Sequence, residues 1–345
     1  MTPSRFQAIT GRYRDLRIAV LGDFCLDRYL EIDPARKELS IETGLPVHNV
    51  VNVRAQPGGA GTILNNLSAL GVGKIFPIGF VGEDGEGLEL FEALKKRPGV
   101  RMDFVLRTEQ RRTFTYCKPL VMVDPPVELN RLDFKNWTPT PASIEGQIRE
   151  RLERAAGSVD AIIVLEQVDI PETGVVTQAV LEGLKMIVEK APELSVVSDS
   201  RRGLHGYPPV TLKMNAAELQ ALTGRAVPSD LDTIKQTAAS LATERGRAVF
   251  ITLAERGMLA AAPNGEIEHV PALPLRGPID IVGAGDAVTA NLTSALSAGA
   301  TLREALQMAT AAGSVVIHKL GTTGTASTTE LEELIASASI QTSFV

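Results

Sequence analysis

Asp280-Ile281-Val282-Gly283-Ala284-Gly285-Asp286 is a glycine-rich segment, and a run of small residues, 287–298, follows it. The pattern predicts a tight turn that opens a helix. At a helix start, unpartnered backbone N–H groups and the positive end of the helix dipole form a site for an anion. A carboxylate there, Asp286, is placed to take a proton from a hydroxyl while the N–H groups hold a phosphoryl group. Phosphoryl transfer to an alcohol is the predicted chemistry; a plain turn with an acidic dipole partner is the alternative.

The composition is that of a globular protein. The chain has 345 residues, of which 44% are hydrophobic and 22% charged, and its net charge is -6. No long basic block supports nucleic-acid or membrane binding. Two cysteines, Cys25 and Cys117, form neither a disulfide framework nor a zinc pattern. With a polar start and no apolar run long enough to span a bilayer, a cytoplasmic protein is expected.

Short apolar, β-branched runs alternate with segments of helical spacing along most of the chain. Strands are predicted at residues 17–21, 75–81, 161–165, 195–198 and 248–253. Helices are predicted at residues 62–70, 88–96, 144–156, 177–189, 216–222 and 231–245. This alternation predicts one α/β domain over residues 1–345, with three α/β/α layers and a mainly parallel central sheet. Polar residues that follow the strands, such as Asp23, Glu166 and Asp199, should meet at one sheet edge.

Two regions interrupt this alternation. Residues 28–56 and 112–124 lack helical spacing and have strand-like pieces. We expect them to form a small β lid over the site, and a β appendage used in dimerisation is the alternative. Residues 124–141 contain four prolines and are predicted to be a connecting loop.

A second glycine-rich segment, Pro57-Gly58-Gly59-Ala60-Gly61, precedes the helix predicted at residues 62–70. Glycines at a helix start allow a ligand or another backbone to approach closely. Neither the Gly-x-Gly-x-x-Gly dinucleotide fingerprint nor the Walker phosphate loop occurs here.

Five segments in the same order resemble the ribokinase family of sugar kinases, of the PfkB type. They are Gly22-Asp23 with Asp27, Gly58-Gly59, Asn215-x-x-Glu218, Thr252 to Gly257, and the turn ending at Asp286. The resemblance runs from about residue 17 to residue 334 and implies a ribokinase-like fold. Residues 22–29, 130–134 and 319–322 are most similar to the heptose-7-phosphate kinases.

The resemblance implies an ATP-dependent sugar kinase that uses Mg²⁺, in which Asp286 is the base. It assigns the anion hole to Gly283, Ala284 and Gly285. It assigns the sugar side to Asp23, Asp27, Gly58, Gly59, Thr62 and Asn66. It assigns the nucleotide side to Asn215, Thr252, Gly257, Lys319 and Gly321. It assigns Glu218 to Mg²⁺ and Asp280 to a monovalent cation such as K⁺. Family habit also implies a homodimer through the lid.

The chain departs from the heptose kinases at the acceptor end. Those enzymes carry a lysine in the run after the third strand, which here is Glu166-Gln167-Val168-Asp169-Ile170. On the lid strand Lys118 is present, but Pro119 and Leu120 follow where an arginine is expected. Loss of cations argues against a phosphorylated acceptor, so the sugar and its phosphorylation state stay open.

Several residues allow a second interpretation. Asn215 and Glu218 also form the pattern of a helix capping box. Asp23 could cap a strand end, and Asp27 could pair with Arg28. Asp199 with Arg201 and Arg202 is open between a surface ion pair and groups that face the triphosphate. A solvated face or a phosphate clamp would explain Lys118, Arg111, Arg112 and Arg131.

Two other functions compete with the sugar kinase. A nucleoside kinase on the same fold would need an aromatic acceptor pocket, and only 4% of the residues are aromatic. A catalytically silent regulator that binds sugar or nucleotide would not need Asp286 and its complete glycine turn.

Overall fold

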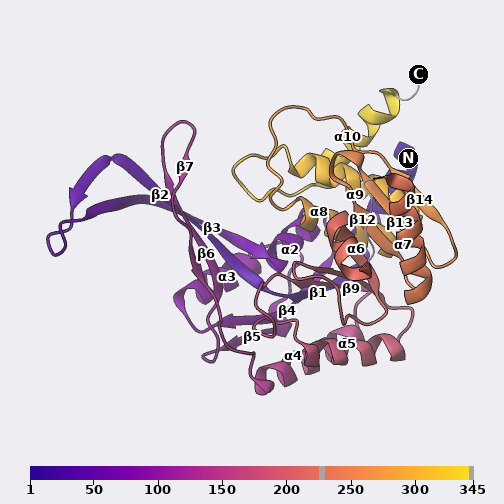
Figure 1. Cartoon of the computed structure of the whole chain (residues 1–345), viewed down its shortest axis with the longest axis horizontal. Helices are drawn as coiled ribbons and strands as arrows, with labels where there is room; N and C mark the ends of the chain where they lie inside the picture. Colours follow the sequence, from indigo (N-terminus) through magenta and orange to yellow (C-terminus); the bar gives the residue numbers. More distant parts are fainter. Residues whose placement is uncertain (225–229, 342–345) are drawn as a thin grey trace.

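A large, mainly parallel sheet forms the centre of the protein in the computed structural model, which describes residues 1–224 and 230–341 (Figure 1). Its strands in the described residues run in the order β14-β13-β12-β11-β10-β9-β1-β4-β5. Their bounds are β1 (Arg17–Gly22), β4 (Lys74–Gly82), β5 (Val105–Thr108), β9 (Ala161–Glu166), β10 (Ser195–Ser200), β11 (Thr211–Asn215), β12 (Val249–Thr252), β13 (Met258–Ala261) and β14 (Ile267–Val270). Only β13 pairs antiparallel with its two neighbours, β12 and β14, so the predicted mainly parallel sheet is confirmed.

Helices cover both faces of this sheet and complete three layers (Figure 1). One face packs against α1 (Pro3–Thr10), α2 (Ala60–Ala69), α3 (Gly85–Lys95), α8 (Ala284–Ser297), α9 (Leu302–Val316) and α10 (Thr328–Gln341). The other face packs against α4 (Ala142–Ala156), α5 (Gln178–Lys190), α6 (Ala216–Thr223) and α7 (Leu231–Arg245). Alternate residues of β1 serve the two cores: Ile18 and Val20 point to the first, Ala19 and Leu21 to the second.

The strand bounds follow from burial. All six residues of β9 and five of the six residues of β1 are buried, which is what the apolar, β-branched runs predicted. Because these strands are parallel, their carboxyl ends meet at one edge of the sheet. Asp23 follows β1 at that edge, and Glu166 ends β9 there. The site is built on this edge.

A second sheet, below called the lid, projects from the body (Figure 1). Its strand order is β3-β2-β6-β7, with β8 paired to β6. Its strands are β2 (Phe24–Leu39), β3 (Pro46–Gly59), β6 (Phe114–Val121), β7 (Val127–Glu128) and β8 (Leu132–Phe134). The prediction of a plain connecting loop over 124–141 is therefore wrong, because β7 and β8 lie in it. Their residues are mostly exposed, so they lack the apolar pattern that marks a strand.

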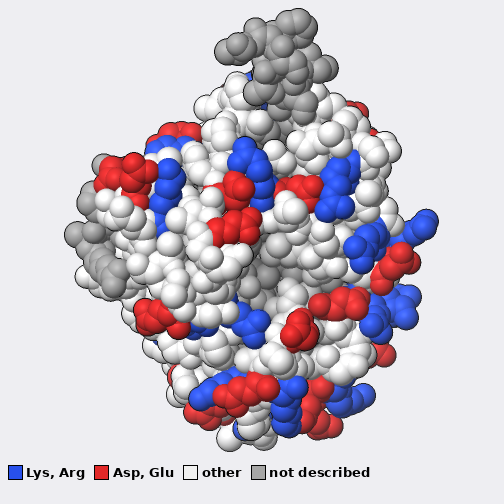
Figure 2. Space-filling view, turned by 90° about the vertical axis from the view of Figure 1, so that its right-hand side faces the viewer, with Lys and Arg blue, Asp and Glu red and all other residues white. Residues whose placement is uncertain are grey.

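The surface carries charges of both signs. On the face drawn in Figure 2, Lys and Arg side chains are interspersed with Asp and Glu side chains around a central hollow. Among the described residues, none of the helices has both the length and the apolar character needed to cross a membrane.

Candidate active site

The first turn of α8 has the geometry of an anion-binding helix start. Gly283 is its N-cap, with φ 81°, and a Cβ there would lie 2.5 Å from Thr323 Cγ2, so only glycine fits. No side chain caps the helix. In the described part of the chain, the amides of Gly285 and Asp286 have no hydrogen-bond acceptor. Two free N–H groups and the helix dipole therefore converge beside Asp286.

Asp286 is half-buried in this turn. Burial, and next the charge of Asp199, raise the pKa of Asp286 from 3.8 to about 7, while Lys213 opposes them. Asp27 of the lid and Arg201 also act on this carboxyl group, so the lid and the sheet edge face the same space. A carboxylate with a pKa near 7 suits a general base at neutral pH.

Lys213 is a buried cation below the start of α8, and the sequence analysis missed it. Its Nζ donates a hydrogen bond of 2.7 Å to Asp199 Oδ2. Thr289 Oγ1 donates to the same oxygen at 3.2 Å. A Cβ on Gly285 would lie 3.1 Å from Lys213 Nζ. The signal in the sequence was a lysine inside an otherwise apolar strand, Leu212-Lys213-Met214.

Asp27 lies on the lid side of the site. It is buried on β2, and a Cβ on Gly58 would come within 2.6 Å of its Oδ2, so Gly58 makes room for the carboxylate. Lys118 Nζ lies 3.9 Å from Asp27 Oδ1. Burial raises the pKa of Asp27, and Lys118 and Arg131 act against that. Gly59, with φ 55°, is the N-cap of α2.

Asp23 is engaged within the protein. It is fully buried, and its carboxylate accepts backbone N–H bonds from Gln167 (2.8 Å), Val168 (3.2 Å) and Val175 (2.6 Å). A Cβ on Gly174 would lie 2.4 Å from Asp23 Oδ1. Because both oxygens accept hydrogen bonds within the protein, Asp23 holds the loop at 167–175, below called the Asp23 loop. Its contact with the sugar stays a prediction.

Thr62 and Asn66 also lie inside the protein. Asn66 is fully buried; its Nδ2 donates to Thr62 O (3.0 Å) and its Oδ1 accepts from Ala326 N (3.1 Å). It ties α2 to the segment before α10, and its assignment to the sugar stays a prediction. Thr62 is buried, and its methyl carbon would lie 3.5 Å from a Cβ on Gly283. It therefore packs under the glycine turn.

The residues assigned to the nucleotide lie where β11 and β12 end. Asn215 and Glu218 form a complete capping box on α6: Glu218 N donates to Asn215 Oδ1 (2.9 Å), and Asn215 N donates to Glu218 Oε2 (2.7 Å). The capping interpretation is thus confirmed, and it leaves the second oxygen of Glu218 for another partner. Thr252 ends β12, next to Asn215 in register. Gly257 has φ 87°, and a Cβ there would collide with Val270 O.

The remaining predicted residues border α8 and α9. Asp280 Oδ1 accepts from Val282 N (3.0 Å), and Asp280 N donates to Ile317 O (2.7 Å). Lys319 Nζ donates to Thr325 O and pairs with Glu330 of α10, so it ties the loop before α10 to that helix. Gly321 is exposed, with φ 69°. The ammonium of Lys319 is thus engaged within the protein, and its assignment to the nucleotide stays a prediction.

The residues present fit Mg²⁺ held mostly by phosphates and water. Within residues 1–224 and 230–341, no three His, Cys, Asp or Glu side chains gather as a metal-binding group. Glu218 offers one carboxylate oxygen beside the nucleotide side, and burial raises its pKa. Mg²⁺ commonly binds one or two carboxylates and substrate phosphates.

Cations surround the acceptor space from three elements. Arg131 lies 4.9 Å above the Tyr116 ring and binds Asp133 with two hydrogen bonds, 2.6 and 2.7 Å. Lys118 Nζ accompanies Asp27, and Arg201 is exposed beside β10. The charge of Arg201 favours the ionised forms of Asp286 and Tyr116, whose pKa values burial raises first. Sequence reasoning grouped Lys118 and Arg131 as a possible phosphate clamp but did not add Arg201 to them.

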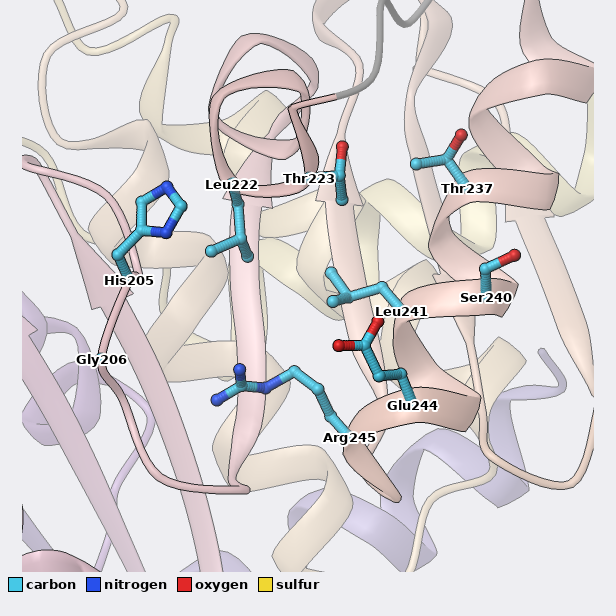
Figure 3. Close-up of a pocket in the computed structure, with 9 residues that line it drawn as sticks. All are labelled: His205, Gly206, Leu222, Thr223, Thr237, Ser240, Leu241, Glu244 and Arg245. Atoms are coloured by element: carbon cyan, nitrogen blue, oxygen red, sulfur yellow. The ribbon is translucent and has the colours of Figure 1, made fainter.

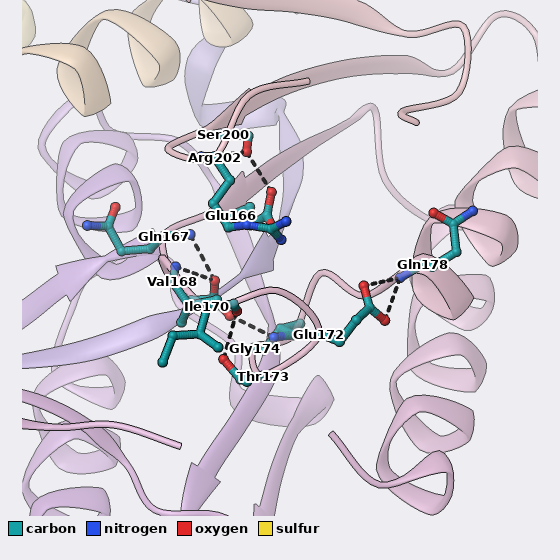
Figure 4. Close-up of polar contacts among 12 residues, drawn as sticks. Glu166, Gln167, Val168, Ile170, Glu172, Thr173, Gly174, Gln178, Ser200 and Arg202 are labelled. Carbon is teal, nitrogen blue, oxygen red and sulfur yellow. Dashed lines mark hydrogen bonds and ion pairs between the residues drawn. The ribbon is translucent and has the colours of Figure 1, made fainter. Parts of the chain in front are cut away.

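Glu166 ends β9, and its carboxylate binds side chains at and just after the end of the neighbouring strand β10. Ser200 Oγ donates to Glu166 Oε2 (2.6 Å) and Arg202 Nη1 to Oε1 (2.6 Å) (Figure 4). Arg202 therefore pairs with Glu166. Arg201 and Arg202 are both exposed, and Arg202 is the one that binds this carboxylate.

A separate cavity of about 280 Å³ lies between α6, α7 and the loop after β10 (Figure 3). None of the predicted site residues lines it. Its arginine, Arg245, donates to Tyr207 O (2.6 Å) and Pro208 O (2.8 Å) and so serves the backbone. The convergence of Asp286, Lys213, Asp199 and Asp27, and not this cavity, marks the candidate site.

Comparisons with solved structures show the same fold. Ribokinase of Arabidopsis thaliana with ribose and ATP has a TM-score of 0.67 and 19% identity, over 93% of this chain and 98% of that one. Phosphofructokinase-2 of Escherichia coli with fructose-6-phosphate has a TM-score of 0.68 and 19% identity, over 94% of this chain and 99% of that one. The prediction of a ribokinase-like fold is confirmed.

Sequence comparison gives relatives and a family. The bifunctional protein HldE of Gluconobacter oxydans is 30% identical over 311 residues, 90% of this chain and 62% of the relative. HldE of Caulobacter vibrioides is 32% identical over 307 residues, 88% of this chain and 60% of the relative. The chain thus spans about three fifths of these relatives' length. Residues 17–329 match the family described as pfkB family carbohydrate kinase, and the chain belongs to that family.

Proposed function

We propose that this chain transfers the γ-phosphoryl group of ATP to a hydroxyl of a phosphorylated sugar, with Asp286 as the base. One observation carries the proposal: the Asp286 carboxylate lies beside two unpartnered amides and shares its space with Asp27 of the lid. Family membership supports the reaction class. Free amides at a helix start suit phosphoryl oxygens, and an ionised carboxylate suits a hydroxyl proton.

The proposed reaction is an in-line displacement. The sugar hydroxyl oxygen forms a bond to the γ-phosphorus as the bond to the β-phosphate oxygen breaks, and ADP leaves. Asp286 takes the hydroxyl proton. The amides of Gly285 and Asp286 hold the phosphoryl oxygens, where charge must be stabilised during transfer. Asp27 accepts a hydrogen bond from the sugar and orients it.

The nucleotide side completes the arrangement. Thr252 and Gly257 border the phosphates of ATP, and Asn215 places the start of α6 next to them. Glu218 would hold Mg²⁺, which when bound neutralises phosphate charge. Asp280 remains a candidate for a monovalent cation such as K⁺.

A substrate panel tests the reaction. ATP turnover is measured with free sugars, sugar phosphates and nucleosides as acceptors. We expect turnover that depends on a sugar phosphate. Turnover with nucleosides alone, or no acceptor-dependent turnover on the whole panel, would refute the proposal and favour the nucleoside kinase or the silent binder, respectively.

The phosphorylated acceptor is inferred from charge. Sequence departures argued against a phosphate because the cations of the heptose kinases are missing from their usual positions. The structure brings Arg131, Lys118 and Arg201 to the same space from the lid and the sheet edge. Arginine recognises phosphate through planar, charge-assisted hydrogen bonds. In this proposal Arg131 and Arg201, beside the retained Lys118, take the place of the missing lysine and arginine.

Replacing Arg201 by methionine is expected to raise KM for a sugar phosphate by roughly 10- to 100-fold, because a charge-assisted hydrogen bond is lost. KM for the same sugar without phosphate should change less than about threefold. Steady-state kinetics with both acceptors measure the difference. Arg131→Met should act in the same direction.

Arg112→Met is the matched control for the variants Arg201→Met and Arg131→Met. Arg112 lies near the base of the lid but pairs with Asp84 and Glu86 and covers the Phe134 ring. Its replacement should leave the preference for the phosphorylated acceptor unchanged. Equal effects of Arg201→Met on both acceptors would show that this side chain does not bind phosphate.

Two further properties are proposed with this function. A kinase that draws on ATP and keeps two free, buried cysteines is expected in the cytoplasm. The lid is proposed as the interface of a homodimer, because β3 exposes Val50, Val51 and Val53.

A further inference from the structure

Lys213 occupies an unusual position for a lysine. It lies in the middle of β11, between buried Leu212 and Met214, and only 6% of it is exposed. Its ammonium reaches the first turn of α8, where a Cβ on Gly285 would be 3.1 Å away. Asp286 is the next residue in that turn. The cation therefore lies beneath the candidate base.

Asp199 holds the cation in this place. The two side chains form a buried ion pair of 2.7 Å, and Thr289 Oγ1 of α8 donates to the same Asp199 oxygen at 3.2 Å. β10, β11 and α8 thus meet at one carboxylate. Burial disfavours the charged lysine, but Asp199 outweighs it, so the pKa of Lys213 is raised and it keeps its proton.

We propose that Lys213, clamped by Asp199, is a positioning residue that keeps Asp286 ionised at neutral pH. The inference rests on the proposed function for its kinetic consequence only, since the ionisation of Asp286 is measurable without any substrate. It adds Lys213 and Asp199 to the machinery as a pair that sets the pH range of the enzyme.

The charges facing Asp286 come from four directions. Asp199 of β10 and Asp27 of β2 oppose ionisation, whereas Lys213 of β11 and Arg201 after β10 favour it. Arg201 is exposed and its field is screened by solvent, while Lys213 is buried and acts in a low dielectric. Glu218 also faces Lys213. Lys213 is therefore the cation whose removal should change Asp286 most.

Stability alone explains the pair poorly. The cost of removing two charges from water is often as large as their attraction, so a buried pair contributes little net stability. Removing one partner leaves an uncompensated charge and destabilises the fold strongly. A test must therefore include a variant in which both charges are replaced.

The first experiment titrates the Asp286 carboxyl group by NMR in the full chain without nucleotide. Lys213→Met is expected to raise the Asp286 pKa by about one unit or more, and Asp199→Asn to lower it by a similar amount. The double variant, which loses both charges, should return close to the wild-type value. Lys235→Met, which removes a lysine from the surface of α7, should change nothing.

The second experiment follows kcat/KM against pH with the sugar phosphate. Activity should fall below the Asp286 pKa, and the acid limb should move up in Lys213→Met and down in Asp199→Asn. Lys213→Arg should restore the wild-type limb. A purely structural lysine would lower activity at every pH without moving the limb.

The outcomes separate the two proposals. An Asp286 pKa that moves neither in folded Lys213→Met nor in folded Asp199→Asn overturns this inference. Titration shifts as expected in a protein without acceptor-dependent turnover would support the inference and refute the proposed function. If Lys213→Met does not fold, the comparison of the double variant with Asp199→Asn decides: the Asp286 pKa should be higher in the double variant, and equal values would overturn the inference.

Discussion

Replacing Asp286 by asparagine is expected to lower acceptor-dependent turnover by roughly 10²- to 10⁴-fold, because the general base is lost. Asparagine has the same shape and keeps the helix start, so the free amides of Gly285 and Asn at 286 still face the phosphoryl group. The loss should therefore appear in kcat while the nucleotide dissociation constant changes less than about threefold. Steady-state kinetics and calorimetric titration with ATP measure the two quantities.

The thermal stability of this variant provides an internal control. The Asp286 pKa is raised from 3.8 to about 7, so its ionised form costs folding free energy above that pH. At pH 8 the neutral asparagine should leave the melting temperature equal or higher. A lower melting temperature would indicate a damaged fold. Equal turnover in wild type and variant would remove Asp286 from the role of base.

The sequence predicted the glycine turn well because its geometry is local. Gly283 needs φ 81°, which glycine adopts readily, and the helix that follows is built from small residues. The buried strands were equally accessible, since β9 carries an unbroken apolar run. A parallel sheet then brings the strand ends together, so the edge that holds the site followed from element order alone.

The lid was only partly predicted because its strands are exposed. Most residues of β3 before Pro57 are exposed or half-buried, so no alternation of apolar and polar residues marks its length. β7 and β8 have two and three residues and lie in a proline-rich segment. Long-range pairing with β6, and not local propensity, makes them strands.

The site residues that sequence reasoning misplaced depend on distant partners. Lys213 is two residues before the capping-box Asn215, but its importance comes from Asp199 on the next strand and from α8. Asn66 was assigned to the sugar, although Ala326, 260 positions away, occupies its oxygen. A motif gives the residue type at a position, and only packing decides which groups surround it.

Asp23 also depends on distant partners, and its replacement is expected to lower the free energy of unfolding strongly. Asp23→Ala removes the acceptor of three buried N–H groups in the Asp23 loop, and each unsatisfied donor costs about 1–3 kcal/mol. We expect a loss of about 3–6 kcal/mol, a large part of the usual stability of a domain. Urea denaturation at pH 7.5 measures it. Asp23→Asn keeps an acceptor oxygen and should lose less.

The pH dependence of the free energy of unfolding is a second measurement of the Asp23 carboxylate. Burial raises the Asp23 pKa from 3.8 to about 6 against the pull of its three amide donors. The folded state therefore binds a proton more readily than the unfolded state. Between about pH 4 and pH 6 Asp23 contributes more stability as the pH falls, because the ionised form is the costly one. Asp23→Asn should lose this contribution.

Asp33→Ala is the control for both measurements, since Asp33 lies on the lid, pairs with Arg36 and accepts a local hydrogen bond from Ala35 N. It should change the free energy of unfolding by less than about 0.5 kcal/mol. If Asp23→Ala unfolds like the control but raises KM for the acceptor, Asp23 contacts the sugar after all. The expected loss of stability would instead show that Asp23 acts through the loop it holds, which leaves Asp27 as the carboxylate proposed to orient the sugar.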